Sequence, residues 1–284
     1  MIHTPEDMTV TVAADVTLAE LQTELAKSRQ WLPLDPPNPA LTLREILDRN
    51  ESGPRRYGYG TARDYVIGLS VTLADGRVVK SGGQVVKNVA GYDLQKLFLG
   101  SGGTLGTIRE ITFKLRPQPE AEAFMAQECG PAELPHFAKC GRAEKMIEQV
   151  VASDLQPVAL DFVGHNDGRY EVVLGFDGPR TEVDWQLVLA ARLGFTTPTT
   201  LEYDRSFRAG TNTLRKLSVL PSRLLDSIRA LEHPPFVARA GNGVVFHRAA
   251  TGRVSRHTQT ATQLLERRLK DAFDPKHLLP DLPA

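Results

Sequence analysis

Residues 82–107, GGQVVKNVAGYDLQKLFLGSGGTLGT, hold seven glycines in one short stretch. Glycine permits positive φ angles and close approach of the backbone to another group, so the stretch is a candidate cofactor-binding loop. A Walker loop is excluded, because the required GxxxxGK followed by Ser or Thr is absent. The dinucleotide motif GxGxxG is excluded by the spacing within residues 100–106 and by the strand expected after them. The residues leave two interpretations open: a surface for a flat cofactor ring, or plain loops between strands.

The composition indicates an ordinary soluble protein. The chain has 284 residues, with 41% hydrophobic and 24% charged residues and no net charge. The net charge of zero gives no indication of binding to nucleic acid or to an anionic membrane. No apolar run approaches the roughly 20 residues that span a bilayer. The two cysteines, Cys129 and Cys140, fit neither a zinc pattern nor a disulfide framework. We therefore expect a cytoplasmic protein without direct membrane insertion, and no metal site.

Local patterns predict an α+β fold in the first part of the chain. Residues 8–14 alternate as a strand, and the helix after them begins with a capping box of Thr17 and Glu20. Further predicted elements are a short helix at 41–50, a loop at 52–64, a hairpin turning at Asp75 and Gly76, a short helix ending at Gly100, and a strand at 107–117.

A change of composition at residues 116–123 predicts a domain boundary. Beyond it, periodicity predicts helices near 143–152, 181–193, 211–230 and 255–272, strands at 158–163 and 169–176, and a hairpin within 236–249. This pattern is typical of an antiparallel sheet with helices.

The motif KNVAGYDL (87–94), followed by GSGGTLG (100–106), resembles the vanillyl-alcohol oxidase (PCMH-type) family of FAD-binding flavoproteins. Within that family the chain is most similar to the FAD-binding E subunits of bacterial glycolate oxidases. The segment MTVTVAADVTLAELQTELAKSRQWLPLDPP (8–37) and the closing LKDAFDPKHLLP (269–280) carry the same resemblance.

This resemblance implies an FAD domain over residues 1–118, consisting of the second subdomain and shortened at its N-terminus. It also implies an α+β cap domain with an antiparallel sheet over 119–265, and a tail over 266–284 that returns to the FAD domain. FAD is the implied cofactor. Its implied contacts are Gly53, Pro54, Tyr57, Gly58, Gly60, Gly106, Thr107 and Ile108. Tight turns and loops are the alternative roles of these residues, and a structural network is the favoured role of Lys87, Asn88 and Tyr92.

Two departures from the family weaken the expected FAD binding. The glycine-rich loop that grips the FAD pyrophosphate precedes the strand at 8–14 in the family, and it is expected to be missing here. Two family glycines that follow the DPP turn are replaced by Arg44 and Glu45. Bulky side chains obstruct the backbone at this point, and the charge of Glu45 would repel phosphate.

The resemblance implies an FAD-dependent oxidoreductase subunit that acts on a small 2-hydroxy acid such as glycolate. The alternative is a non-catalytic structural or regulatory subunit, docked on a flavin-bearing D-type subunit and an iron–sulfur subunit. A sugar or amine substrate also stays open. The sequence identifies no catalytic residue; His247, beside Arg248, is a weak candidate for a proton acceptor.

Overall fold

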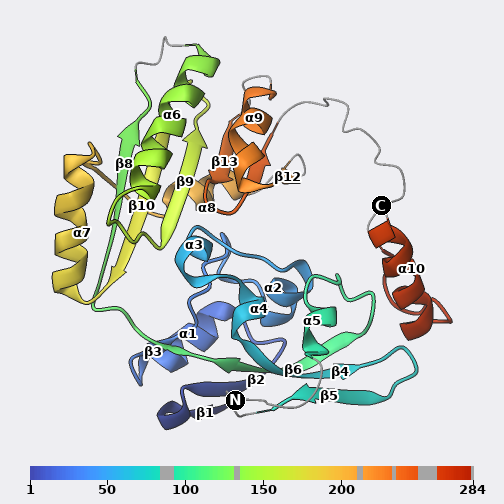
Figure 1. The fold of residues 1–284 in the computed structure, drawn as a ribbon. Coiled ribbons are helices and arrows are strands. Elements are labelled where there is room, and N and C mark those ends of the chain that lie inside the picture. The colour runs from blue at the N-terminus through green and yellow to red at the C-terminus, as the bar shows by residue number, and fades with distance from the viewer. Residues whose placement is uncertain (84–92, 131–134, 210–213, 232–234, 249–260, 283–284) are drawn as a thin grey trace. The chain divides into compact units, whose positions relative to one another are not determined.

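The computed structural model describes residues 1–83, 93–130, 135–209, 214–231, 235–248 and 261–282. The chain divides into two compact units. The first unit consists of Met1–Ser52, Thr61–Gln118 and Ser255–Ala284, and the second of Gly53–Gly60 and Pro119–Val254. Each unit is described by itself below (Figure 1).

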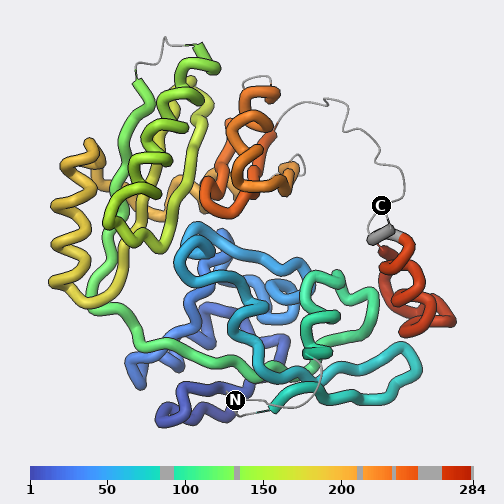
Figure 2. Tube along the Cα trace, in the orientation of Figure 1, coloured from blue at the N-terminus to red at the C-terminus, as the bar shows by residue number. Residues whose placement is uncertain are grey.

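The first unit is built on an antiparallel sheet in the order β1-β2-β6-β4-β5. Its strands are β1 (Ile2–Thr4), β2 (Thr9–Ala13), β4 (Val66–Thr72), β5 (Val78–Gly82) and β6 (Thr107–Lys114). A separate two-stranded sheet pairs β3 (Gln30–Trp31) with β7 (Arg116–Pro117). The predicted hairpin is confirmed, because β4 and β5 pair around Asp75 and Gly76, where Gly76 has φ +84° (Figure 2).

Capping boxes start some of the helices of the first unit. The helices are η1 (Pro5–Asp7), α1 (Leu18–Ala26), α2 (Leu43–Arg49), α4 (Ala62–Tyr65), α5 (Gln95–Phe98) and α10 (Ala261–Phe273). The predicted capping box of Thr17 and Glu20 is confirmed at α1, and α2 starts with the equivalent pair, Thr42 and Glu45. Each box satisfies backbone N–H groups that a helix start otherwise leaves unpaired.

The second unit is built on a seven-stranded antiparallel sheet in the order β11-β8-β10-β9-β13-β14-β12. Its strands are β8 (Ala121–Glu128), β9 (Ala159–Gly164), β10 (Tyr170–Gly178), β11 (Thr197–Thr199), β12 (Arg215–Ser218), β13 (Phe236–Arg239) and β14 (Val244–His247). The antiparallel α+β sheet predicted for this part of the chain is confirmed.

Helices cover both faces of this sheet. They are α3 (Arg56–Tyr59), α6 (His136–Val151), α7 (Arg180–Arg192), α8 (Glu202–Arg208), η2 (Pro221–Arg223) and α9 (Leu224–Arg229). Helix α6 lies along the sheet in both views, and with α7 and α9 it encloses the larger core, which includes Phe162 and Phe236 (Figures 1 and 2). Helix α8 packs on a smaller cluster formed by alternate strand positions such as Val163 and Val237.

Two predictions of secondary structure are wrong. The helix expected at 211–230 is, where the structure describes it, strand β12 followed by η2 and α9. Leu217 pairs with Val245 of β14, so the pairing of strands overrides the helical pattern. The expected loop at 52–64 contains the one-turn helices α3 and α4. Among the helices of the described ranges, none is long and apolar enough to cross a bilayer.

Candidate functional site

The glycine loop at residues 100–106 packs against the end of helix α2. Gly100 N donates to Leu47 O at 2.8 Å, and Gly102 N donates to Asp48 O at 2.9 Å. Positive φ angles of 81°, 64° and 75° at Gly100, Gly102 and Gly103 make this turn possible. The loop therefore caps the C-terminal carbonyl groups of α2, which gives its positive-φ glycines a structural role.

The predicted contacts Gly106, Thr107 and Ile108 lie at the start of β6. A Cβ on Gly106 would be 2.6 Å from Val71 Cγ1, so only glycine fits beside β4 here. Thr107 pairs with Thr72 in the sheet, and the Ile108 side chain is fully buried. Ile108 O accepts a hydrogen bond of 2.9 Å from Arg44 Nε, so this main-chain acceptor already has a partner within the unit.

The first turn of α2 uses its own N–H groups internally. Leu43 N donates to Val16 O at 2.9 Å, Arg44 N donates to Ala14 O at 2.8 Å, and Glu45 N donates to Thr42 Oγ1 at 3.2 Å. The Glu45 carboxylate in turn accepts from Thr42 N, which lowers the pKa of Glu45. A phosphate needs several free N–H donors or cations, and this helix start offers a carboxylate instead.

The end of α2 carries a feature that the sequence analysis missed. Asp48 Oδ1 and Asn50 Oδ1 are buried, and no donor among the described residues reaches either oxygen. Burial raises the pKa of Asp48 to about 6, while Arg44 and Arg49 limit the rise. A lone Asp in a helix gives no sequence signal for this arrangement, because it depends on the glycine loop packed against the helix.

The C-terminal helix α10 is fastened to the same glycine loop. Lys270 is buried, and its Nζ donates to Thr104 O at 3.1 Å, to Leu279 O at 3.2 Å and to Asp274 Oδ2 at 2.5 Å. Burial favours a raised pKa for Asp274, but the bonds from Lys270 and two backbone N–H groups hold its pKa at about 2. The Phe98 and Phe273 rings add an edge-to-face contact at 6.0 Å.

The predicted contacts Gly53, Pro54, Tyr57, Gly58 and Gly60 belong to the second unit. Gly58 N donates to Val158 O at 3.0 Å, and a Cβ on Gly58 would be 2.8 Å from Val158 Cα. The Tyr57 ring lies so close to Gly241 that a Cβ there would be 1.9 Å from Tyr57 Cε2.

Gly53 and Pro54 are buried ahead of α3, and Gly60 ends this helix with φ +82°. These positions thus have structural roles within the second unit, and their FAD contacts stay predictions.

The same segment is tied to the sheet by charge. Arg55 is buried, pairs with Glu122, lies 3.4 Å from Asp177 Oδ2 and sits over the Phe124 ring. Tyr59 donates its hydroxyl to Asp177 Oδ1 at 2.5 Å. Burial raises the pKa of Asp177, and its bonds to Tyr59 and Arg55 oppose that rise. The ion pair and the tyrosine together anchor α3 to strands β8 and β10.

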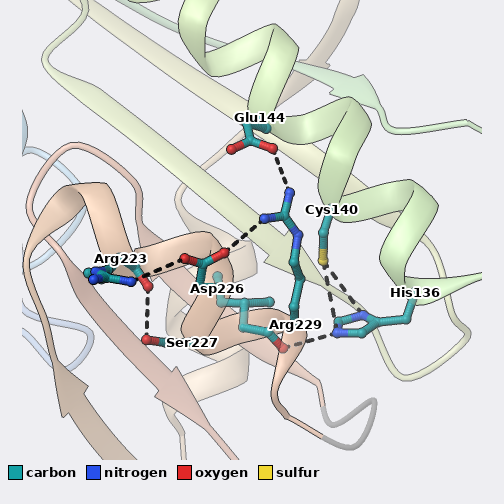
Figure 3. Close-up of polar contacts among 8 residues, drawn as sticks. His136, Cys140, Glu144, Arg223, Asp226, Ser227 and Arg229 are labelled. Atoms are coloured by element: carbon teal, nitrogen blue, oxygen red, sulfur yellow. Dashed lines mark hydrogen bonds and ion pairs between the residues drawn. The ribbon is translucent and has the colours of Figure 1, made fainter.

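A second cluster of reactive residue types lies between α6 and α9 (Figure 3). Cys140 Sγ is 3.8 Å from His136 Nδ1 and 3.9 Å from Nε2, so it faces neither nitrogen closely. Both nitrogens have nearer partners, Tyr170 Oη at 2.7 Å and Ile228 O at 3.0 Å. Burial raises the pKa of the Cys140 thiol to about 11. The cluster is therefore a packing feature and not an activated nucleophile.

Figure 3 also shows Arg229 joining the two helices, with Nη2 at 2.5 Å from Glu144 and Nη1 at 3.0 Å from Asp226. This bridge fixes α9 beside α6.

The most deeply buried charges lie under α8. Arg239 is 2% exposed; its Nη2 is 2.6 Å from Asp204 Oδ1, and its Nη1 bonds Asp161. Tyr203 of α8 donates to Asp161 Oδ2 at 2.7 Å. Burial lowers the pKa of Arg239, but the two carboxylates outweigh it and the pKa is raised. These bonds fasten α8 to the sheet, although Asp161 Oδ1 and Asp204 Oδ2 accept no hydrogen bond among the described residues.

His247, the weak candidate for a proton acceptor, lies at the end of β14 and pairs with Arg215 of β12 in the sheet. Burial and the charge of Arg215 lower its pKa. Within the described ranges, no three His, Cys, Asp or Glu side chains are close enough to hold a metal ion. Lys87, Asn88 and Tyr92 lie outside the described residues.

Comparison with known proteins identifies the first part of the chain. Residues 2–82 match a family described as an FAD binding domain. The first part of the chain therefore carries the sequence of an FAD-binding domain. It is 34% identical to the glycolate oxidase subunit GlcD of Bacillus subtilis over 159 residues, which is 56% of this chain and 32% of that protein. It is also 34% identical to GlcE of Escherichia coli over 128 residues, which is 44% of this chain and 37% of that subunit.

The chain therefore spans about a third of the length of these two relatives. A D-lactate dehydrogenase of Arabidopsis thaliana is 42% identical over 115 residues, which is 40% of this chain and 20% of that enzyme. In fold the chain resembles an alkyldihydroxyacetonephosphate synthase, with a TM-score of 0.64 and 19% identity over 96% of this chain and 63% of that chain. The predicted family, fold class and FAD cofactor are confirmed.

The described residues fit a flavin nucleotide in part. The glycine loop leaves open space at Gly102, where no atom lies within 4 Å of the place of a Cβ. The first turn of α2 does not fit the diphosphate, because its N–H groups are occupied and Glu45 is negative. This agrees with the weakening that Arg44 and Glu45 predict.

Proposed function

We propose that this chain is part of an FAD-dependent oxidoreductase that oxidises a small 2-hydroxy acid such as glycolate or D-lactate. The observation that carries the proposal is the identity of 34% to 42% with proteins named glycolate oxidase subunits and D-lactate dehydrogenase. When bound, FAD supplies the acceptor for the two electrons that leave the hydroxy acid. Residues Gly106, Thr107 and Ile108 are our candidates on the first unit for main-chain contacts to the cofactor.

The experiment is a flavin titration followed by reduction. The purified chain is incubated with FAD, freed of unbound flavin, and its visible spectrum recorded. Glycolate, D-lactate and L-lactate are then added without oxygen. We expect bound flavin and bleaching with glycolate or D-lactate. A colourless protein contradicts FAD binding by this chain, and bound flavin that no 2-hydroxy acid bleaches contradicts the catalytic role.

A second candidate function is a non-catalytic subunit of a glycolate-oxidase-like complex. The closed first turn of α2 favours it, because Leu43, Arg44 and Glu45 leave no N–H donor there for a diphosphate. Its partners would be a flavin-bearing D-type subunit and an iron–sulfur subunit. Affinity purification of the tagged chain from its own cells tests this: recovery of both partners with flavin only on the D-type subunit supports it. Recovery of the chain alone contradicts it.

A further inference from the structure

A cavity of about 260 Å³ lies in the second unit, between helix α8 and the ends of three neighbouring strands. Strand β13 pairs with both β9 and β14, so the residues next to their paired ends form one row. His165, Pro235 and Arg248 make up this row and line the cavity. Val163 packs under α8, and alternation along the strand puts the His165 side chain on the same face of the sheet.

Arg248 supplies a fixed guanidinium group to this cavity. Its Nη2 donates to the main-chain oxygens of Phe207 and Ala209 at the end of α8, the second at 3.3 Å. The guanidinium carbon lies 5.1 Å from the centre of the Phe207 ring. These contacts hold the group in one orientation before any ligand arrives. A preorganised group loses little conformational freedom when it binds an anion.

The Nη1 group of Arg248 is left for a ligand. Its Nε is buried without a bond, whereas Nη1 is not among the buried atoms and has no bond within the described part of the chain. No carboxylate of the described residues forms an ion pair with Arg248 either. The cavity therefore borders a cation that has a reachable N–H donor and no counter-charge from the residues seen around it.

The carboxylates on this face of the sheet have other partners. Glu171 Oε1 is 2.8 Å from His165 Nε2, and Asp161 Oδ2 accepts a bond of 2.7 Å from the Tyr203 hydroxyl. Both acids lie on strands of the sheet and are engaged with side chains that line the cavity. These pairings leave the positive charge of Arg248 for a group from outside the chain.

Size and walls indicate what kind of molecule fits. The volume lies just below the roughly 300–1,000 Å³ of typical ligand pockets, so the occupant is a small molecule. Val163, Phe207 and Pro235 give the cavity an apolar wall opposite its charge. The planar fork of an arginine matches a carboxylate group. A phosphate group carries more charge and needs several donors or cations, and Arg248 is a single cation.

The cavity lies far from the predicted cofactor contacts of the same unit. Gly58 N bonds Val158 O just before β9, whereas His165 follows the other end of this strand. The seven positions from Val158 to His165 span about 23 Å of extended strand. The predicted FAD contacts Tyr57 and Gly58 are thus at the opposite end of β9 from the cavity.

We propose that this cavity binds a small carboxylate with an apolar body, through a hydrogen-bonded ion pair with Nη1 of Arg248. The apolar part of the ligand lies against Val163, Phe207 and Pro235. This site goes beyond the proposed function, because it is separate from the predicted cofactor contacts and does not depend on whether the chain holds FAD.

The experiment compares two molecules that differ in charge but not in shape. The full chain is titrated with benzoate and with benzamide, and binding is followed by saturation-transfer NMR. Inorganic phosphate is added as a competitor of benzoate. We expect benzoate to bind with a Kd of about 1 mM and benzamide to bind at least about tenfold more weakly. Phosphate should not displace benzoate.

Three variants locate the binding. Arg248→Gln removes the charge and should weaken benzoate at least about tenfold. Ser206→Phe fills the cavity from its α8 wall, leaves Arg248 in place and should abolish benzoate binding. Arg205→Gln removes an exposed arginine of the same helix and should bind like wild type. Thermal unfolding of each protein without ligand shows whether its fold is kept.

The possible results are decisive in either direction. Loss of benzoate binding in a folded Ser206→Phe protein, with normal binding in the Arg205 control, supports the inference. A Ser206→Phe protein that binds benzoate like wild type overturns it, whatever the Arg248 variant does. Equal binding of benzamide and benzoate overturns it too, as does displacement by phosphate, which would indicate a site for inorganic anions. Failure of wild type to bind benzoate also overturns the inference and leaves the proposed function untouched.

Discussion

The two units bury charge in different ways. In the second unit, Arg239 lies between Asp161 and Asp204, and Tyr203 bonds one of those carboxylates. In the first unit, the buried Oδ1 of Asp48 has no donor from the described part of the chain. In the cluster of the second unit each carboxylate has a cation beside it, although Asp161 Oδ1 accepts no hydrogen bond among the described residues. Asp48 is influenced by the charges of Arg44 and Arg49, and burial still raises its pKa to about 6.

The strongest test of the contrast is Arg239→Ala. The change removes the cation that lies between two buried carboxylates and leaves only Arg208, 3.9 Å from Asp204, beside them, so the free energy of unfolding should fall by about 3–5 kcal/mol. Urea unfolding followed by circular dichroism measures it. The control Arg205→Ala removes an exposed arginine of α8 and should change stability by about 0.5 kcal/mol or less. Equal effects of the two variants would show that the buried cluster contributes nothing special.

A smaller, local effect is expected for Lys270→Met. The side chain keeps its length but loses its bonds to Thr104 O, Leu279 O and Asp274. Helix α10 should then open more often, and hydrogen exchange measured by mass spectrometry should accelerate in Ala261–Phe273. Arg268→Met, an exposed change on the same helix, serves as control. Unchanged exchange in the Lys270 variant would mean that apolar packing alone holds the helix.

Asp48 should also leave a pH signature that sharpens the comparison. Its folded pKa of about 6 exceeds the ordinary 3.8, so the folded state binds its proton more tightly than the unfolded state. The resulting stabilisation is complete below pH 3.8 and is lost as the pH rises through 6.

Asp48→Asn should therefore exceed wild type in stability by about 1 kcal/mol at pH 7, with the half-exposed position reducing the effect, and the gap should close by pH 4. Urea titrations at four pH values measure this gap. A gap of the same size at every pH would contradict the raised pKa.

The smallest expected effect concerns the two cysteines, which should not react with an alkylating reagent in the folded chain. Burial raises the pKa of Cys129 to about 12 and that of Cys140 to about 11. The second unit thus keeps its thiols neutral as well as its charges paired. Iodoacetamide at pH 8 should label neither cysteine in the folded chain and both in urea, as measured by mass spectrometry. Rapid labelling of the folded chain would show that the core around α6 opens easily.

Sequence predicted the parts of the fold that depend on neighbouring residues. The capping box at Thr17, the hairpin at Asp75 and Gly76, and the helix near 181–193 each arise from a few adjacent positions. The bond between Arg239 and Asp161 spans 78 positions, and no local pattern indicates it. The helix expected at 211–230 failed for the same reason, since pairing of β12 with β14 decides the structure there.

The candidate site shows the same limit. Glycines drew attention to residues 100–106, and a family resemblance identified the cofactor. The role of that loop as a cap on α2, and the acceptors it leaves unpaired at Asp48 and Asn50, depend on contacts between segments about 50 residues apart. Sequence also showed Arg44 and Glu45 as unusual, but only the structure shows that Arg44 bonds Ile108 O and that the helix start is closed.

The attachment of Lys270 to Thr104 O has a consequence for biosynthesis. The first unit combines Met1–Ser52 and Thr61–Gln118 with Ser255–Ala284, so translation must pass residue 255 before this unit can close. The second unit, encoded mostly between those two stretches, can take shape earlier. The glycine loop at residues 100–106 is thus fastened only after Lys270 has been translated, and a chain that stops before Lys270 lacks the bond to Thr104 O.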